Sequence, residues 1–239
     1  MPADVWKQRD VAAAFLNERS LSIPDRPRQL DVLMRLLRFA PKPPRRFLDL
    51  GCGDALLLAT CLAAFPEATG VALDFSPLML EQARSRLAPC GSRAAAVEVD
   101  LQTPAWLQKV TGPFDAVISG FAIHHLTDER KQSLYREIFG ALSAGGVFIN
   151  CEHVSSPTPR IESMFDDAMA DHLCQRRREL GETVTKEEML KQFLERPDRA
   201  ANILASVEDQ CRWLGDIGFV EVDCFWKYFE LAIFGGVRS

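Results

Sequence analysis

Glycines and aspartates follow three apolar runs of the chain at positions where a nucleotide can be held. In FLDLGCGDA at 47–55, Gly51 and Gly53 stand between an apolar run and a helical stretch. Glycines let a ligand approach the backbone, and the amides of such a turn favour polar or anionic groups. Asp74 follows at roughly the 20-residue offset of an acid that binds ribose hydroxyls, and Asp100 has the same placement one run later. This pattern predicts a nucleoside-containing ligand.

A dinucleotide site is the first alternative for such a turn. The fingerprint G-x-G-x-x-G/A needs a small residue at its last position, where this chain has Leu56. The sequence therefore weighs against hydride transfer with a nicotinamide cofactor.

Titratable side chains follow the fourth and fifth apolar runs. His124 and His125 come after the fourth run, and Glu152 and His153 close the fifth. Because ligands of open α/β sheets bind beyond the carboxyl ends of the strands, we take His124, Glu152 and His153 as candidate acid/base residues. The alternative is a histidine pair that closes a loop, beside ordinary polar residues at a strand end. No further His or Cys stands at ligand spacing, so no metal is expected.

The apolar pattern predicts an α/β architecture. Short runs rich in Val, Ile and Phe alternate with helical stretches along residues 46–154, which is typical of repeated βαβ units and a mostly parallel sheet. Strands are expected at 46–50, 70–75, 95–101, 115–119 and 146–152. Helices between them are expected at 54–65, from the N-cap Ser76, and from the N-cap Thr127 to about Leu142.

The flanking segments predict more helices and one hairpin. Residues 155–205 carry no strand signal and are expected to form a helical insertion, with a capping box at Thr185 and Glu188. A helix and two paired strands should end the chain. These helices are expected at 5–18, 27–39, 160–180, 186–195 and 206–216.

Taken together, the motifs resemble the class I S-adenosylmethionine-dependent methyltransferases. The matching pieces are DLGCG at 49–53, ALDFS at 72–76, the acid at 100, FDAVISGFAIHHL at 114–126, LSAGGVFI at 142–149 and the hairpin after 218. The resemblance implies a Rossmann-like, doubly wound, mostly parallel seven-stranded sheet with an antiparallel last strand. It also implies N-terminal helices and a helical lid insertion after strand five, within a single domain over 1–239.

The resemblance also implies S-adenosyl-L-methionine as the cofactor. The positions that match the family's cofactor motifs are Asp49, Gly51 and Gly53 for the methionine part, Asp74 and Phe75 for the ribose, Asp100 and Leu101 for the adenine, and Ser119 and Gly120 after strand four. Ala55 departs from the family, which often has a third glycine there, and a helix start tolerates that change.

The expected acceptor is a small molecule methylated on a hydroxyl. Strand four ends in Ser119-Gly120-Phe121 and not in the Asn-Pro-Pro-aromatic loop of adenine and glutamine N-methyltransferases. Apolar side chains of the insertion and the C-terminal region form either core or the wall of a lid over a partly aromatic acceptor. These side chains are Met164, Phe165, Met169, Phe193, Trp213, Trp226 and Tyr228.

Composition places the chain among ordinary soluble proteins, and we expect it in the cytoplasm. It has 239 residues, 47% of them hydrophobic, and a net charge of −5, which weighs against a nucleic-acid partner. No apolar run is long enough for a membrane span. Seven scattered cysteines without a CxxC pair indicate neither a disulfide framework nor a zinc site. The apolar helices before residue 40 and in the insertion could pair with a second copy of the chain and form a homodimer.

Three other functions stay open. The chain also resembles carboxy-S-adenosylmethionine synthase, a transfer-RNA modification enzyme, in its leading helices, its insertion and its terminal segment. That family has an arginine for the extra carboxylate, which aligns here with Trp213, and Arg212 is one position off. Direct RNA methylation rests only on a basic stretch between Arg26 and Arg46. A partner protein that binds the cofactor without catalysis is the third.

Overall fold

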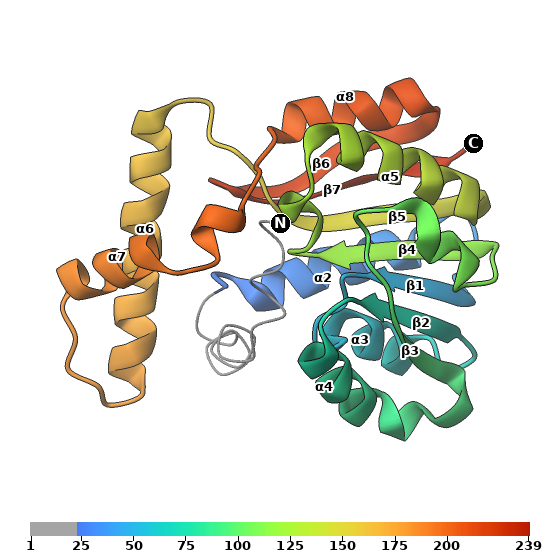
Figure 1. Cartoon of the computed structure of the whole chain (residues 1–239), viewed down its shortest axis with the longest axis horizontal. Coiled ribbons are helices and arrows are strands. Elements are labelled where there is room, and N and C mark those ends of the chain that lie inside the picture. Colours follow the sequence, from blue (N-terminus) through green and yellow to red (C-terminus); the bar gives the residue numbers. More distant parts are fainter. Residues whose placement is uncertain (1–22) are drawn as a thin grey trace.

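The predicted strands form one seven-stranded sheet in the computed structural model, which describes residues 23–239 (Figure 1). The order is β3-β2-β1-β4-β5-β7-β6, and only β7 runs antiparallel to its two neighbours. The strands are β1 (Arg46–Leu50), β2 (Thr69–Asp74), β3 (Ala94–Glu98), β4 (Phe114–Gly120), β5 (Leu142–His153), β6 (Phe219–Tyr228) and β7 (Leu231–Arg238). The expected doubly wound sheet with an antiparallel last strand is confirmed, whereas the helix expected at 5–18 lies outside the described residues.

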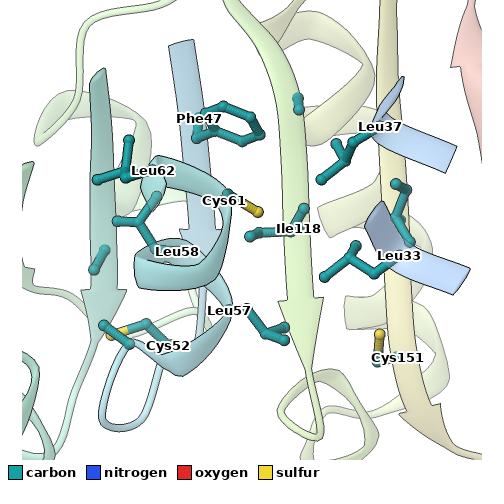
Figure 2. Close-up of a cluster of buried hydrophobic side chains, with 14 of the residues drawn as sticks. Leu33, Leu37, Phe47, Cys52, Leu57, Leu58, Cys61, Leu62, Ile118 and Cys151 are labelled. Carbon is teal, nitrogen blue, oxygen red and sulfur yellow. The ribbon is translucent and has the colours of Figure 1, made fainter. Parts of the chain in front are cut away.

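Helices cover both faces of the sheet and leave a core on each side. One face carries α2 (Arg26–Arg38), α3 (Leu56–Ala64) and α4 (Pro77–Leu87), and the other carries α5 (Asp128–Ala141) and α8 (Val207–Ile217). Figure 2 shows the first core, in which Cys61 of α3 and Leu33 of α2 lie toward Ile118 of β4, while Leu58 of α3 points toward β2. Because β1 and β4 are buried on both faces, their sequences are continuous apolar runs.

Helix starts follow the predicted N-cap residues, with one difference. The Thr127 hydroxyl accepts from the Arg130 amide at 3.3 Å, and Thr185 with Glu188 forms the predicted capping box. Ser76 stands at the N-cap of α4, but its side chain makes no cap hydrogen bond. The short 3-10 helices are η2 (Ala88–Arg93), η3 (Pro104–Gln108), η4 (Ile123–His125) and η5 (Arg199–Ala201).

The segment after β5 forms the predicted helical insertion. Its helices α6 (Pro159–Glu179) and α7 (Lys186–Glu195) project beyond the strand ends of the sheet (Figure 1). Where the segment leaves and rejoins the sheet region, the Ser155 amide donates to the Ala205 carbonyl at 3.0 Å. Phe165, Met169 and Phe193 of the insertion pack on Leu231 of β7, while Met164 is exposed.

The strand order changes direction between β1 and β4, and this creates the crevice for a ligand. Strands β2 and β3 lie on one side of β1, and β4 and β5 lie on the other. The chain therefore continues from β1 to α3 on one face of the sheet and from β4 to α5 on the other. All the predicted site residues lie at or near this edge of the sheet.

Candidate active site

The turn after β1 takes its shape from two glycines in the left-handed region. Gly51 has φ 63° and Gly53 has φ 54°. A Cβ atom on Gly51 would stand 2.2 Å from the Cβ of Ala122, in the loop after β4. Glycine at 51 is therefore required by the close approach of two loops of the protein, in addition to any approach of a ligand.

Asp74, at the end of β2, accepts hydrogen bonds from two backbone amides. Its Oδ2 accepts from the Gly53 amide at 2.8 Å, and its Oδ1 accepts from the Ser76 amide at 2.9 Å. Burial raises the pKa of Asp74 to about 6, and the amide hydrogen bonds oppose that shift. The carboxylate thus ties the β1 turn to the β2 end and is still one of the groups that line a pocket.

The pocket at this edge has a volume of about 810 Å³, counted with its mouth. Most of the predicted cofactor residues line it: Gly51, Gly53, Asp74, Phe75, Asp100, Leu101 and Gly120. The other two are buried and do not line the pocket. The buried Asp49 accepts from the Leu58 amide at 3.2 Å, and the buried Ser119 hydroxyl donates to the Leu50 carbonyl at 2.8 Å.

The residues present fit a nucleoside cofactor of the predicted kind. Asp74 offers carboxylate oxygens at the pocket wall, and the exposed Asp100 lies one strand away. Met79 and Leu126 add apolar surface suited to a flat ring.

The three predicted catalytic residues form one buried network. His124 Nδ1 lies 2.5 Å from Glu152 Oε1, and the His124 amide donates to Glu152 Oε2 at 3.1 Å. Glu152 also accepts from the His153 amide at 2.8 Å and from Asn150 Nδ2 at 3.3 Å. An ionised carboxylate only accepts, so His124 carries its proton on Nδ1 and leaves Nε2 as a base.

Burial sets the protonation of this network. It lowers the pKa of His124 well below its ordinary value, with His153 acting in the same direction. Burial raises the pKa of Glu152, and its hydrogen bonds from the His153 amide and from Asn150 oppose the shift. The imidazole is therefore neutral at physiological pH, as a general base must be before it accepts a proton.

A second histidine–carboxylate pair lies beside the first, and it includes a residue that sequence reasoning missed. His153 Nε2 lies 2.9 Å from Oε2 of the buried Glu230. The His153 and His124 rings are 5.6 Å apart. Glu230 sits in the turn between β6 and β7, and the pairing of His153 with Leu231 brings it to His153. The sequence holds no local signal for this contact.

His125, which the sequence ranked below His124, is the histidine that lines the pocket. Its Nδ1 lies 3.2 Å from the Ala201 carbonyl, and the Ile203 amide donates to the His124 carbonyl at 2.8 Å. Burial lowers the pKa of His125 to about 3. The end of the insertion is therefore bonded directly to the loop that carries both histidines.

The fold and the pocket define a class I Rossmann-like domain that binds a nucleoside cofactor. Residues 47–146 match the family model described as a methyltransferase domain. The chain therefore contains a class I S-adenosylmethionine-dependent methyltransferase domain, and S-adenosylmethionine is the cofactor of that class.

Two proteins of named activity are similar to this chain in sequence. The trans-aconitate 2-methyltransferase of Methylobacterium radiotolerans is 34% identical over 53% of this chain and 45% of its own. The carboxy-S-adenosyl-L-methionine synthase of Nautilia profundicola is 19% identical over 94% of this chain and 91% of its own.

Solved structures share the fold. An O-methyltransferase family protein from Burkholderia thailandensis superposes with TM-score 0.64 and 19% identity over 89% of this chain and 56% of its own. PigF with SAH gives TM-score 0.64 and 20% identity over 99% of this chain and 62% of its own. The chain thus spans less than half the length of the trans-aconitate 2-methyltransferase and less than two thirds the length of the proteins in these two structures.

Within residues 23–239, no cluster of three or more His, Cys, Asp or Glu side chains has the arrangement of a metal site. No helix in the same range has the length and apolar character needed to cross a bilayer.

Proposed function

We propose that this protein transfers the methyl group of S-adenosylmethionine to a hydroxyl group of a small-molecule acceptor, with His124 as the general base. The cofactor supplies an electrophilic methyl group on a sulfonium whose leaving group is already good. The chain's own residues then have to align the acceptor, exclude water and take up the acceptor's proton. Asp74, Asp100 and the glycines of the β1 turn hold the cofactor in this proposal.

The contact between His124 and Glu152 is the observation that carries the choice of a hydroxyl acceptor. An amine or thiolate that arrives deprotonated needs no base, whereas a hydroxyl gains reactivity when a base removes its proton. The short Nδ1 to Oε1 contact fixes the tautomer and stabilises the imidazolium after Nε2 accepts a proton. His153 and Glu230 stand beside this base and are proposed to orient the acceptor.

Aromatic side chains around the second pair favour a partly aromatic acceptor. The Phe165 ring centroid lies 5.7 Å from that of His153, and Phe121 and Phe229 pack on the same cluster. Several of the structural relatives are named as O-methyltransferases, which supports the same group transfer. Helices α6 and α7 serve as the lid in this proposal.

The test is product formation with an acceptor library. Purified protein is incubated with S-adenosylmethionine and small aromatic hydroxyl compounds, and methylated products are detected by mass spectrometry. We expect Asp74→Ala to abolish cofactor binding. His124→Asn should keep cofactor binding and lower kcat about 10²- to 10⁴-fold, while His172→Asn on α6 should retain activity. Full activity of His124→Asn would refute the assigned base.

A second candidate function is synthesis of a carboxylated cofactor. It is favoured by the match to carboxy-S-adenosyl-L-methionine synthases over nearly the whole of both chains. Arg212, the nearest arginine to the expected position, is 63% exposed and pairs with Asp209 at 2.6 Å on the surface of α8. It is thus placed away from a buried ligand. Detection of a carboxylated cofactor, when a carboxylic acid that can release CO2 is added to the assay as the carboxyl donor, would establish this function instead.

A further inference from the structure

Arg26 breaks the usual rules for the start of a helix. It is the first residue of α2, where the helix dipole disfavours a cation. The preceding Asp25 has a left-handed backbone with φ 53°, and its side chain makes no cap hydrogen bond. A non-glycine residue in this region is strained. Such a set of local conflicts at one point indicates a functional constraint.

The guanidinium of Arg26 is buried and only partly satisfied. Its Nη1 donates to Gln29 Oε1 at 2.9 Å, whereas Nε and Nη2 are buried with no hydrogen-bond partner among the described residues. Burial lowers the pKa of Arg26, with Cys151 and Asp49 acting in the opposite direction. The group still carries its charge at physiological pH, because arginine does not lose its proton in proteins.

The two unpaired nitrogens of the buried Arg26 guanidinium could be satisfied by an anion that accepts hydrogen bonds from both. Nε and Nη2 of a guanidinium form the edge that pairs with both oxygens of a carboxylate. The thiol of Cys151 provides no charge, because burial raises its pKa to about 12. Among residues 23–239, the group that accepts a hydrogen bond from Arg26 is the neutral side-chain amide of Gln29.

The position of Arg26 joins it to the cofactor pocket. Its Cζ lies 5.6 Å from the centroid of Phe121, which lines the pocket. Phe121 follows β4, and Cys151 lies on β5. Both strands lie on the opposite side of β1 from β2, which ends at Asp74, and from β3, which Asp100 follows. Arg26 itself does not line the pocket; it lies behind Phe121, on the side of β1 away from Asp74 and Asp100.

We propose that Arg26 binds a carboxylate at this end of the pocket, which rests on the proposed use of S-adenosylmethionine. The carboxylate has two sources, the aminoacyl end of the cofactor or the acceptor. Its oxygens would pair with Nε and Nη2, and the Phe121 ring would hold the guanidinium plane. Occupancy would complete the hydrogen bonding of a group that the helix start leaves incomplete.

Calorimetric titration separates the two sources. The ligands are S-adenosylhomocysteine, which has the aminoacyl carboxylate, and 5′-methylthioadenosine, which lacks it. We expect Arg26→Gln to weaken the first ligand about tenfold or more and the second less than about twofold. Arg26→Lys should be intermediate. Arg28→Gln is the matched control, because Arg28 is 62% exposed two residues later and pairs with Asp31.

If Arg26→Gln leaves both affinities unchanged, the acceptor is tested as the source. Trans-aconitate, a probe with three carboxylates, is titrated into protein saturated with S-adenosylhomocysteine. Binding to the wild type that is about tenfold weaker in Arg26→Gln supports the proposal through the acceptor.

Three outcomes overturn the proposal. In the first, Arg26→Gln changes neither cofactor nor carboxylate binding. In the second, both adenosine ligands weaken equally, which shows a structural effect. In the third, the wild type binds neither S-adenosylhomocysteine nor 5′-methylthioadenosine, and this result would refute the proposed function as well. Binding that depends on Asp74 but not on Arg26 removes only this inference.

Discussion

At the residue scale, Asp74 combines a structural and a binding task in one buried carboxylate. It holds the amides of Gly53 and Ser76 and also lines the pocket. A ribose hydroxyl donates more strongly to the ionised carboxylate than to the acid. The protonation of this single group should therefore control cofactor affinity.

Cofactor affinity should fall as the pH falls through the pKa of Asp74, which burial raises to about 6. If only the ionised form binds, the dissociation constant for S-adenosylhomocysteine rises about tenfold per pH unit below pH 6. Asp74→Asn should bind about 10- to 100-fold more weakly at pH 7.5 and show a flat profile. Calorimetry from pH 5 to 8 measures both, with the exposed Glu67→Gln as the control. A wild-type profile that is flat would contradict this prediction.

The buried His125 should make the protein sensitive to acid. Burial lowers its pKa from 6.5 to about 3, so the unfolded state binds more protons between these values. Stability is therefore lost as the pH falls below 6.5, by at most about 1.4 kcal/mol per pH unit for this group. His125→Gln, which can still donate to Ala201, should have the shallower slope in urea unfolding from pH 7.5 to 5. Equal slopes would show that another group dominates.

At the scale of elements, the site depends on contact between the β1 turn and the loop after β4. Gly51 makes that contact possible, because any Cβ there collides with Ala122. The same contact brings the pocket floor and the histidine loop into one rigid unit. Its strength can be tested with a pair of glycines that both have a positive φ.

Gly51→Ala should be far more costly than Gly91→Ala. Both glycines have positive φ, 63° and 57°, but a Cβ on Gly91 meets nothing within 4 Å. Gly91 has ψ −133°, so Gly91→Ala should cost about 1–3 kcal/mol of backbone strain. Gly51→Ala adds the collision with Ala122 to its own backbone strain, so it should cost more and abolish cofactor binding. Adding Ala122→Gly removes the collision and should restore part of the binding. Thermal unfolding and calorimetry give the two readouts, and equal effects of the two alanines would refute the argument.

The sequence predicted the elements well because most of them carry strong local signals. The runs at β1, β4 and β5 and the caps at Thr127 and Thr185 belong to this group. The third strand was expected to reach residue 101 but ends at Glu98, because Asp100 Oδ1 accepts from the Gln102 amide and turns the chain.

The parts of the site that the sequence missed depend on contacts between distant segments. Glu230 reaches His153 only through the pairing of β5 with β7. Arg26 shows its unpaired nitrogens only once α2 is packed beside Phe121. The short helix η4 directs His125 rather than His124 to the pocket wall. No spacing rule in the sequence carries this information.

At the scale of the whole molecule, Phe165 is one of the side chains through which the insertion packs on the sheet. Phe165 of α6 is 2% exposed and lies beside the rings of His153, Phe193 and Phe229. Its neighbour Met164 is 51% exposed. This pair allows the contact to be removed while the helix itself is kept.

Phe165→Ala should loosen the insertion and leave the cofactor pocket intact. The lost packing is expected to cost about 3–5 kcal/mol, and KM for the acceptor should rise while the affinity for S-adenosylhomocysteine is unchanged. Met164→Ala should change stability by less than about 0.5 kcal/mol. Steady-state kinetics and calorimetry separate the two effects. A matching loss of cofactor affinity would show that the insertion also shapes the cofactor pocket.

The hydrogen bond between Ser155 and Ala205 has a consequence for how this protein can diverge. The insertion leaves and rejoins the sheet region at nearly the same point, so its length does not set the spacing of β5 and α8. Each doubling of a flexible connection of this kind costs only about 0.6 kcal/mol. Helices α6 and α7 can therefore be exchanged as a cassette to alter acceptor choice, provided that residues 201–205 keep their bonds to the histidine loop.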